Sequence, residues 1–591
     1  MVFSEIKESL SNHNFENAIM LIDNIEEKHQ LEAKIYKSVV YVRKGDFGKG
    51  LKIANESIKL AKKKKNKTLE IAARVAKTNA LNKIDNYEIG LTFALETEKI
   101  YNKLQARGKT KLLEWIGHLY NLIGIFYDYK GDFDLALLYY KQGLEKREQL
   151  DDQSGVAKSL NNIGEIYRIK GELDLSLDYY LQSLNHFVLT ENQINLAMVY
   201  SNIGALYNQK GNTDLGLDYL RKALRMLENH EDNLVLAEIY YKFIVLSLDI
   251  NQHKEAVNYY KQLCSISVKD ENKFVIAFKQ IAQALILKNT NRTKTKAQAQ
   301  EIFEEIINQE ILMVELTVFA LLNLCEMLLN ELKLYGDEDI LIELHEYSNR
   351  LLEIATEQSS SLIQVEAYII QSRISLLELD IDKARKLLTQ AQLISEVKGL
   401  QKLAIRISVD HDALLSSIDR WNKLIEDEAP FEDRLELADF EDIMKKLVRK
   451  KIDIPEIVEE TPLLFLILDE AGNSKYTKRF SQSRAINETL VGVFLTAIIS
   501  FTKTAFSSNE PVERINHQDY TIILKSTHSY VFCYVFKGPS YYAVQKIDKM
   551  LEIVKDSPKI LKLFEDFRFQ TIPEEDPIIQ NMMTQVFTNH K

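Results

Sequence analysis

A repeated unit of 40 residues, the separation of Gly124 from Gly164, is the feature that most restricts the fold of this chain. Three segments align without a gap and share residues at the same phase: Gly124, Gly164 and Gly204; Tyr127, Tyr167 and Tyr207; Gly131, Gly171 and Gly211; Leu144, Leu184 and Leu224. A fourth, decayed copy has Asn251 in place of the turn glycine. One such unit cannot bury its own apolar face, so stacked copies must supply the core.

Each copy is predicted to form two antiparallel helices. In the first helix, apolar residues such as Leu160 and Ile163 fall at helical spacing. Gly171 is expected to end this helix because glycine readily adopts the left-handed conformation. Gly164, which lacks a Cβ atom, and the small Ser176 would let the two helices pack closely.

These residues resemble the tetratricopeptide repeat, with Ile-Gly and Tyr in the first helix, a turn glycine, and a small residue in the second. The family's closing proline is absent, and the period exceeds the usual one of about 34 residues. Longer repeats with Asn-Asn-Ile-Gly, here Asn161–Gly164, are similar to those of kinesin light chains and related cargo or peptide binders. The resemblance is clearest over 112–265. Turn signals such as Gly45 and degenerate helix pairs over 270–424 extend the predicted array over 1–424.

Proline placement marks the end of this array. All eight prolines lie at or after Pro430, whereas proline inside a helix costs about 3 kcal/mol. Residues 425–461 are predicted to be a linker with one helix near Leu435–Lys451, and residues 462–591 a second domain. The predicted fold is therefore mostly α: an α-solenoid of stacked helix pairs, a tetratricopeptide superhelix, followed by a small α/β domain with an antiparallel five-stranded sheet.

The second domain reads as two strands, a helix, three strands and a helix. The strands are predicted at Leu463–Leu468, before Phe480, and at Val512–Ile515, Tyr520–Leu524 and Tyr530–Phe536; the helices at Asn487–Thr502 and Tyr541–Val554, with room for one more in the tail. This order looks like the longin and roadblock family of small α/β domains. That resemblance implies docking to a small GTPase, or self-association. A profilin-like or PAS-like sensor domain, or a plain capping domain, would give similar spacing.

The tetratricopeptide resemblance implies that one side of each first helix forms a partner-binding groove. Carried over to this sequence, the groove positions are His118, Asn121 and Asp128; Lys158, Asn161, Asn162, Glu165 and Arg168; and Met198, Asn202 and Asn208. A side-chain amide both donates and accepts, so it suits an extended peptide backbone. The alternative is that these asparagines cap helices or face water.

Several other classes of protein are excluded by composition. The formal net charge of -11 argues against a broad nucleic-acid surface. Three scattered cysteines exclude a disulfide framework and a CxxC zinc site, and they suit a reducing compartment. No signal peptide and no apolar stretch of about 20 residues is evident, so we expect a cytoplasmic protein without a transmembrane segment.

No catalytic motif is evident in the sequence. Gly108-Lys109-Thr110 lacks the preceding glycine and strand of a phosphate-binding loop, and His411, between two aspartates, is a weak candidate for acid-base or metal chemistry. We therefore expect no enzymatic activity, no metal site and no cofactor. The leading hypothesis is a scaffold that holds a protein or peptide in the groove and a second protein through the C-terminal domain. The alternative is a signal-responsive regulator, in which ligand binding changes how the array holds a target protein.

Overall fold

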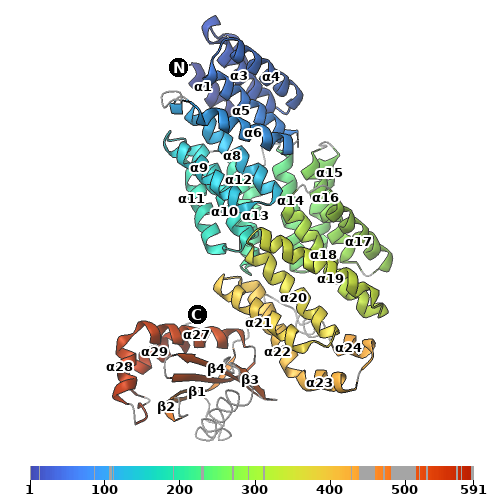
Figure 1. The fold of residues 1–591 in the computed structure, drawn as a ribbon, viewed down its shortest axis with the longest axis vertical. Helices are drawn as coiled ribbons and strands as arrows, with labels where there is room; N and C mark the ends of the chain where they lie inside the picture. The colour runs from blue at the N-terminus through green and yellow to red at the C-terminus, as the bar shows by residue number, and fades with distance from the viewer. Residues whose placement is uncertain are drawn as a thin grey trace. The chain divides into compact units, whose positions relative to one another are not determined.

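The computed structural model describes the chain apart from residues 438–459 and 481–513 and some shorter stretches at the two ends and in turns. It divides into two compact units, residues 1–371 with 393–402, and residues 372–392 with 403–591. The first unit is helical, and the second combines helices with a sheet (Figure 1). The domain boundaries predicted at residues 424 and 461 stay a prediction.

The first unit begins with α1 (Val2–Ser11), α2 (Phe15–Asp23), the 3-10 turn η1 (Glu27–His29), α3 (Gln30–Arg43), α4 (Phe47–Lys63), α5 (Lys67–Lys83) and α6 (Tyr87–Asn102). Its helix pairs are α8 (Leu113–Lys130) with α9 (Phe133–Glu148), α10 (Gln153–Lys170) with α11 (Leu173–Thr190), α12 (Gln193–Gln209) with α13 (Thr213–Met226), α14 (Asn233–Asp249) with α15 (His253–Ser267), α16 (Lys273–Lys288) with α17 (Thr293–Asn308), and α18 (Val314–Tyr335) with α19 (Asp339–Glu357). The next helices, α20 (Ser361–Leu377), α21 (Ile381–Val397) and α22 (Gln401–Ser416), each contribute to both units.

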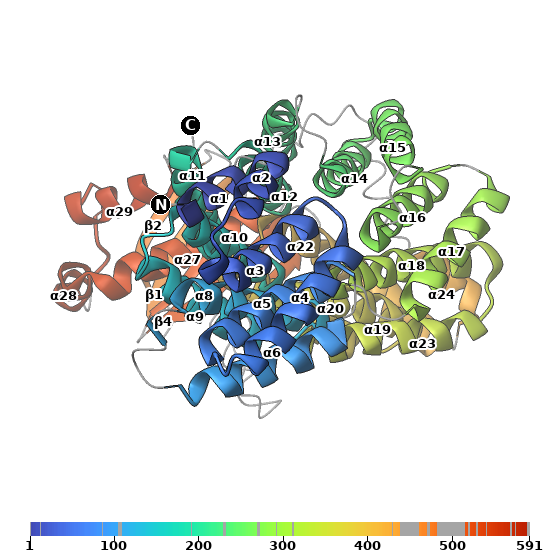
Figure 2. The same ribbon diagram turned by 90° about the horizontal axis from the view of Figure 1, so that it is seen from above.

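Successive first helices lie side by side, since α8 packs on α10, α10 on α12, and α12 on α14. The view from above shows the N-terminal helices in blue beside α8, in line with the packing of α5 on α8 (Figure 2). The predicted solenoid of stacked helix pairs is therefore confirmed.

The turn between the two helices of each copy has the predicted geometry. Gly131, Gly171 and Gly211 have positive φ angles of 83°, 85° and 87°, and Asn251 has 59° in the fourth copy. Asparagine is the residue that best replaces glycine in the left-handed conformation. The decayed copy therefore keeps the turn without the glycine.

Close packing inside a copy depends on the small residues that the sequence indicates. A Cβ atom on Gly164 would lie 2.8 Å from the ring of Tyr180. The hydroxyl of Ser176 donates a 2.7 Å hydrogen bond to the carbonyl oxygen of Gly164, so the two helices touch at these two residues. The predicted roles of both residues are confirmed.

Residues that come later in the first unit contact the turns of the repeats. The hydroxyl of Ser360 donates a 2.7 Å hydrogen bond to the carbonyl oxygen of Ile169, and a Cβ atom on Gly171 would lie 3.1 Å from the backbone nitrogen of Leu362. Lys402 forms an ion pair with Asp249 at 2.7 Å. The repeats are thus held by contacts distant in sequence as well as by stacking.

The second unit contains α23 (Ile418–Glu426), α24 (Phe431–Leu437), β1 (Thr461–Asp469), β2 (Ser474–Arg479), β3 (Arg514–His517), β4 (Tyr520–Thr527), β5 (Tyr530–Lys537), α27 (Tyr541–Asp556), α28 (Pro558–Asp566) and α29 (Pro577–Phe587). The strands form one antiparallel sheet in the order β2-β1-β5-β4-β3. The predicted antiparallel sheet in the C-terminal part of the chain is therefore confirmed. The helix predicted at Asn487–Thr502 lies outside the described residues, as does most of that predicted at Leu435–Lys451.

The core of the second unit forms between the sheet and its C-terminal helices. Phe465, Tyr534 and Ile523 are neighbours across β1, β5 and β4 and pack in one cluster with α27, α28 and α29. Alternate residues such as Leu464 and Val535 form a second buried cluster on the other side of the sheet. The prediction of a single further helix in the tail is wrong, because Pro558 starts α28 directly after α27 and α29 follows it.

Candidate functional site

An amide ladder joins the first helices of the repeats, and it consists of Asn121, Asn161, Asn162, Asn202 and Lys242. Nδ2 of Asn162 donates to Oδ1 of Asn121 at 3.2 Å, and Nδ2 of Asn202 donates to Oδ1 of Asn161 at 3.1 Å. Nζ of Lys242 then donates to Oδ1 of Asn202 at 2.7 Å. The ladder therefore crosses α8, α10, α12 and α14.

Most of the predicted groove residues are more buried than the sequence suggested. Asn121, Asn161, Arg168, Asn202 and Asn208 are all less than 9% exposed. These side chains lie buried because each first helix packs on the next. Their role in ligand binding stays a prediction.

The remaining predicted groove residues are all half-buried: His118, Asp128, Lys158, Asn162, Glu165 and Met198. Asn208 lies apart from the ladder: its Nδ2 donates to Asp249 at 2.9 Å and its Oδ1 accepts from the hydroxyl of Thr213 at 2.7 Å. Both atoms of that amide have structural partners, so Asn208 is the weakest of the predicted ligand contacts.

A basic cluster adjoins the amide ladder, and we define it as Arg43, Lys83, His118, Arg147 and Lys158. These residues come from α3, α5, α8, α9 and α10. Arg147 connects the cluster to the ladder, since its Nη1 donates to Oδ1 of Asn121 at 3.2 Å. The same nitrogen donates to the hydroxyl of Ser159 at 2.7 Å and to the carbonyl oxygen of Gly155 at 3.0 Å. Arg147 is buried, and all three acceptors are neutral.

The pKa values of three of these residues are lowered mainly by burial, and those of Lys158 and His118 also by neighbouring cations. Burial, and then the charges of Arg43 and Arg147, lower the pKa of Lys158 to about 7. Burial, and then the charges of Arg147, Arg43, Lys158 and Lys83, lower the pKa of His118 to about 3. Burial also lowers the pKa of Arg147 to about 10, opposed only by Asp152. At neutral pH His118 is therefore uncharged and Lys158 about half protonated, whereas Arg147 keeps its charge.

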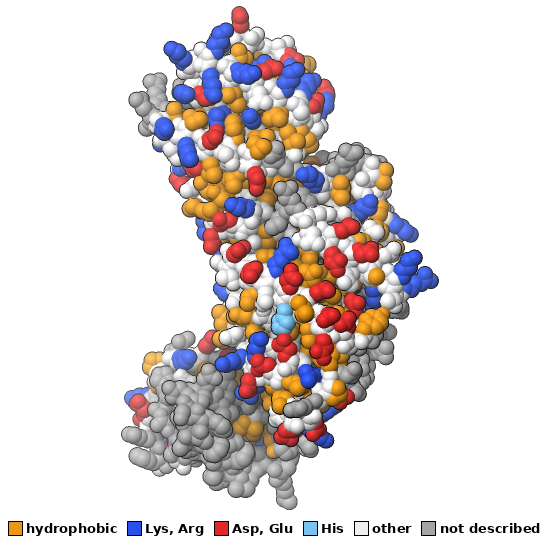
Figure 3. Space-filling view, turned by 45° about the vertical axis from the view of Figure 1, so that its right-hand side comes forward, with side chains coloured by type: hydrophobic (Ala, Val, Ile, Leu, Met, Phe, Trp, Pro, Cys, Tyr) orange, Lys and Arg blue, Asp and Glu red, His pale blue; other side chains and the backbone are white. Residues whose placement is uncertain are grey.

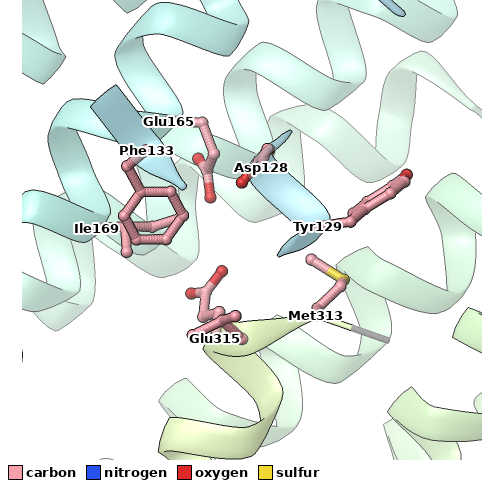
Figure 4. Close-up of a pocket in the computed structure, with 8 residues that line it drawn as sticks. Asp128, Tyr129, Phe133, Glu165, Ile169, Met313 and Glu315 are labelled. Carbon is pink, nitrogen blue, oxygen red and sulfur yellow. The ribbon is translucent and has the colours of Figure 1, made fainter. Parts of the chain in front are cut away.

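A second polar group surrounds Arg168. Its Nη2 donates to Glu315 of α18 at 2.6 Å, and its guanidinium pairs with Glu165 one turn earlier in α10. A small pocket lies beside this group, lined by Asp128, Tyr129, Phe133, Glu165, Ile169, Met313, Val314 and Glu315. Figure 4 shows the carboxyl groups of Glu165 and Glu315 pointing toward each other, with Asp128 beside them.

Asp128 and Glu165 of this pocket differ in protonation. Burial, and then repulsion by Glu165 and Glu315, raise the pKa of Asp128 to about 8. Burial acts in the same direction on Glu165, but the adjacent Arg168 overrides it and lowers the pKa of Glu165 to about 2. Asp128 therefore binds a proton more tightly than Glu165, which remains a carboxylate.

Acidic side chains gather on the surface of α17 and α19, within the first unit (Figure 3). Partial burial and the charges of Glu304, Glu331 and Glu346 raise the pKa of Glu343 there. In the part of the chain that the structure describes, no group of three or more His, Cys, Asp or Glu side chains is arranged to hold a metal ion. No described helix is long and apolar enough to cross a membrane.

The weak candidate His411 lies in the second unit. Its neighbour Asp412 accepts hydrogen bonds from the backbone nitrogen of Ser540, at 3.3 Å, and from its hydroxyl, at 3.0 Å. Asp410 forms an ion pair with Arg373 at 3.3 Å. Both flanking aspartates therefore have structural partners.

Sequence reasoning missed Arg147, although the repeats contain a signal for it. The equivalent position in the next two copies holds Phe187 and Leu227, both buried in the core. Its partner Ser159 likewise replaces an apolar residue, Val199 in the following copy. An arginine in one copy and a serine in the next, both at positions that are apolar in the following copies, thus distinguish this place in the array.

The tetratricopeptide repeat family model matches residues 115–187 and 155–229. Similar solved structures include BtubC (BKLC) from P. vanneervenii, at 15% identity over 45% of this chain and 93% of that one, with a TM-score of 0.29. The apo quorum sensor NprR from B. thuringiensis is 16% identical over 60% of this chain and 97% of that one, with a TM-score of 0.41. NprR in complex with its cognate peptide NprX is 15% identical over the same shares, with a TM-score of 0.45. No curated protein sequence matches the chain. Residues 115–229 are therefore tetratricopeptide repeats.

Proposed function

We propose that this protein is a non-enzymatic scaffold that binds an extended peptide segment of a partner protein along the amide ladder. The observation that carries this proposal is that two polar atoms of the ladder have no hydrogen-bond partner among the described residues. Nδ2 of Asn161 and Oδ1 of Asn162 have no partner among the described residues. An unused donor and an unused acceptor on α10 suit the carbonyl and N–H groups of an extended peptide backbone.

The ladder also prepares these two amides for binding. Because Asn161 accepts from Asn202 and Asn162 donates to Asn121, the orientation of each side chain is set before a ligand arrives. Groups held in place lose little conformational entropy on binding. The ladder thus supports a role for Asn161 and Asn162 as ligand contacts and for Asn121 and Asn202 as their supports.

We further propose that the C-terminal domain docks a second protein, either a small GTPase or another copy of this chain. The strand order β2-β1-β5-β4-β3, with α27 directly after β5, supports the longin-like or roadblock-like assignment on which this proposal rests. Dimerisation would be detected as a doubled mass in light scattering, and GTPase docking by titration with GTP-loaded small GTPases. If neither dimerisation nor GTPase binding is observed, both proposed partners are excluded.

A signal-responsive regulator is the second candidate. Arg168, two turns from Asn161 on α10, forms the ion pair with Glu315 of α18, so a ligand on α10 lies close to a contact between distant helices. In hydrogen exchange, a regulator would show changed protection in α18 when peptide binds. A simple scaffold would show changes in α8, α10 and α12 alone.

The test of peptide binding uses the full chain and a random nine-residue peptide library. We expect wild type to select peptides, and Asn161→Ala or Asn162→Ala to weaken binding about fivefold through loss of one hydrogen bond. Asn258→Ala, on the exposed side of the second helix α15, is the matched control. The proposal fails if no peptide is selected, or if Asn258→Ala weakens binding as much as the ladder variants.

A further inference from the structure

We infer that the outer face of α11 pairs with the same face of a second copy of this chain, about a two-fold axis parallel to the helix. The inference goes beyond the proposed function, because it involves neither the amide ladder nor the C-terminal domain. Its basis is an exposed apolar surface on α11, which we define as Leu175, Leu181, Val188 and Leu189. These side chains are between 40% and 75% exposed. Leu181 lies about two helical turns from Val188 and Leu189, so the three share one side of the helix.

The internal repeats show that this apolar surface belongs to one copy alone. The second half of α11 contains no Asp, Glu, Lys or Arg. The position of Leu181 holds Lys141 and Arg221 in the sister copies, and that of Val188 holds Glu148 in α9. A helix with one side in water normally carries charged residues there, and a contiguous exposed apolar surface marks a contact with a partner. The fold of a copy does not require these residues, since the sister copies have charged ones.

The length of α11 supports the same interpretation. Its sister α9 ends at Glu148 and α13 ends at Met226, whereas α11 continues to Thr190. In this last turn Phe187 is buried, but Val188 and Leu189 are exposed. Apolar side chains left in water contribute nothing to the stability of one chain. Their burial in a contact between chains would gain hydrophobic free energy.

Charges on either side of α11 are complementary between two copies. α11 lies between α9 and α13 in the stack, because α9 packs on α10, and α11 packs on α12, the partner of α13. A two-fold axis parallel to α11 would place α9 of one copy opposite α13 of the other. Glu145 of α9 and Arg225 of α13 are exposed and hold equivalent positions in their copies. The axis therefore brings these opposite charges together twice.

The two cations that the same axis would bring together are engaged within their own copy. Lys141 of α9 and Arg221 of α13 also hold equivalent positions. Nζ of Lys141 donates to the hydroxyl of Tyr167 at 3.1 Å, and Arg221 pairs with Asp218 at 2.7 Å. An axis across the helices would instead place α9 opposite α9, and Glu145 would face the Glu145 side of the second copy. Charge therefore favours the parallel axis.

A second copy also supplies the apolar surface that must cover the first. In a two-fold contact each copy contributes the same side chains, so both sets of four are buried together. Stable interfaces have an apolar centre and a polar rim. Here α11 provides the centre, and the charged residues of α9 and α13 provide the rim.

The experiment measures the mass of the full chain by sedimentation equilibrium from nanomolar to micromolar concentrations. The α11 variant carries Leu181→Arg and Val188→Glu, which introduce the sister residues Arg221 and Glu148 and so keep the fold. We expect wild type to dimerise and the α11 variant to have a dissociation constant at least about a hundredfold higher, with unchanged helical circular dichroism. Ile342→Arg, the same kind of change at an exposed residue of α19, is the control and should leave the dimer intact.

A charge exchange tests the direction of the axis. Glu145→Arg should weaken the dimer about tenfold, because it places two cations opposite each other. Glu145→Arg combined with Arg225→Glu should restore the wild-type dissociation constant, since the opposite charges then meet again in exchanged positions. Failure of the exchange to restore the dimer would exclude the parallel axis.

The inference is overturned if wild type stays monomeric, if the α11 variant dimerises as wild type does, or if Ile342→Arg dissociates the dimer equally. A dimer that persists in the α11 variant would use another surface, such as the C-terminal domain, and would leave the proposed function standing. Failure of peptide binding would overturn the proposed function alone, because the amide ladder lies on the first helices and α11 is a second helix.

Discussion

Arg168 in α10 donates a 2.6 Å hydrogen bond to Glu315 in α18, 147 residues further along the chain. The same guanidinium pairs with Glu165, and its side chain is only 5% exposed. One buried cation thus neutralises two carboxylates from helices that the sequence separates widely. This pair ties the tetratricopeptide repeats to the later helices of the first unit.

Replacing Arg168 by methionine should destabilise the first unit by about 3 kcal/mol, because two carboxylates would face each other without a cation. The measurement is urea unfolding followed by helical circular dichroism. Asp134→Asn provides the control, since it removes an ion pair with Lys170 in which the aspartate is 68% exposed. We expect a change below about 0.5 kcal/mol for the control. Equal effects in the two variants would contradict the assigned role of Arg168.

Asp128→Asn should stabilise the protein more at pH 8 than at pH 5. The pKa of Asp128 is about 8 in the folded chain and about 3.9 when unfolded, so the folded state binds the proton more tightly. The stability that protonated Asp128 contributes is complete below about pH 3.9 and is lost as the pH rises through about 8. Because the side chain is only half-buried, we expect a difference of about 1 to 2 kcal/mol between the two pH values.

Thermal unfolding of wild type and Asp128→Asn across this range tests the pH dependence. Asp134→Asn, an exposed aspartate nearby on α9, should shift stability equally at pH 5 and pH 8. A constant difference between wild type and Asp128→Asn over the range would show that Asp128 does not hold the proton.

Gly171→Ala should cost more stability than Gly211→Ala. Both glycines have positive φ angles, where alanine costs about 1 kcal/mol. In addition, the new Cβ atom at position 171 would lie 3.1 Å from the backbone of Leu362, whereas the one at position 211 meets nothing closer than 3.9 Å. We expect about 2 kcal/mol for Gly171→Ala and about 1 for Gly211→Ala in urea unfolding. Equal costs would show that the backbone at Leu362 shifts to accommodate the new Cβ atom without a measurable loss of stability.

Lys546→Met should destabilise the second unit by about 3 kcal/mol. Nζ of Lys546 pairs with Oε1 of Glu460 at 2.8 Å, and both side chains are buried. The hydroxyl of Tyr534 donates to the same oxygen at 2.7 Å. Without Lys546 the Glu460 carboxylate keeps only a neutral partner inside the protein. Tyr534→Phe, which leaves the ion pair intact, should cost about 1 kcal/mol. If Tyr534→Phe costs more than Lys546→Met, the hydrogen bond and not the ion pair is the main partner of Glu460.

The repeats were readable from sequence because their signals are local. The φ angle at Gly171 and the contact of Gly164 with Tyr180 depend on residues within one copy, and three copies repeat the same signals. The turn at Asn251 was predicted for the same reason. The strand order of the C-terminal domain was not predicted, since the pairing of β1 with β5 joins residues distant in sequence.

The burial of the groove residues could not be predicted from the sequence. Asn161 and Asn202 could be assigned to one side of successive helices, yet their mutual hydrogen bond and burial come from stacking. The basic cluster was missed because Arg43 and Lys83 lie on helices outside the regular repeats. A pattern within one copy carries no information on which other helices approach it.

The sequence by itself determined the helix pairs, their turns and their stacking order, because helical spacing, left-handed turn residues and small contact residues act over a few residues each. Only the tertiary structure decided which charges meet. Arg168 pairs with Glu315, and Arg147 donates hydrogen bonds to Asn121 and Ser159, because separate helices pack against one another. Charge interactions depend on distance in space and on burial, and neither quantity is defined until the whole array has folded.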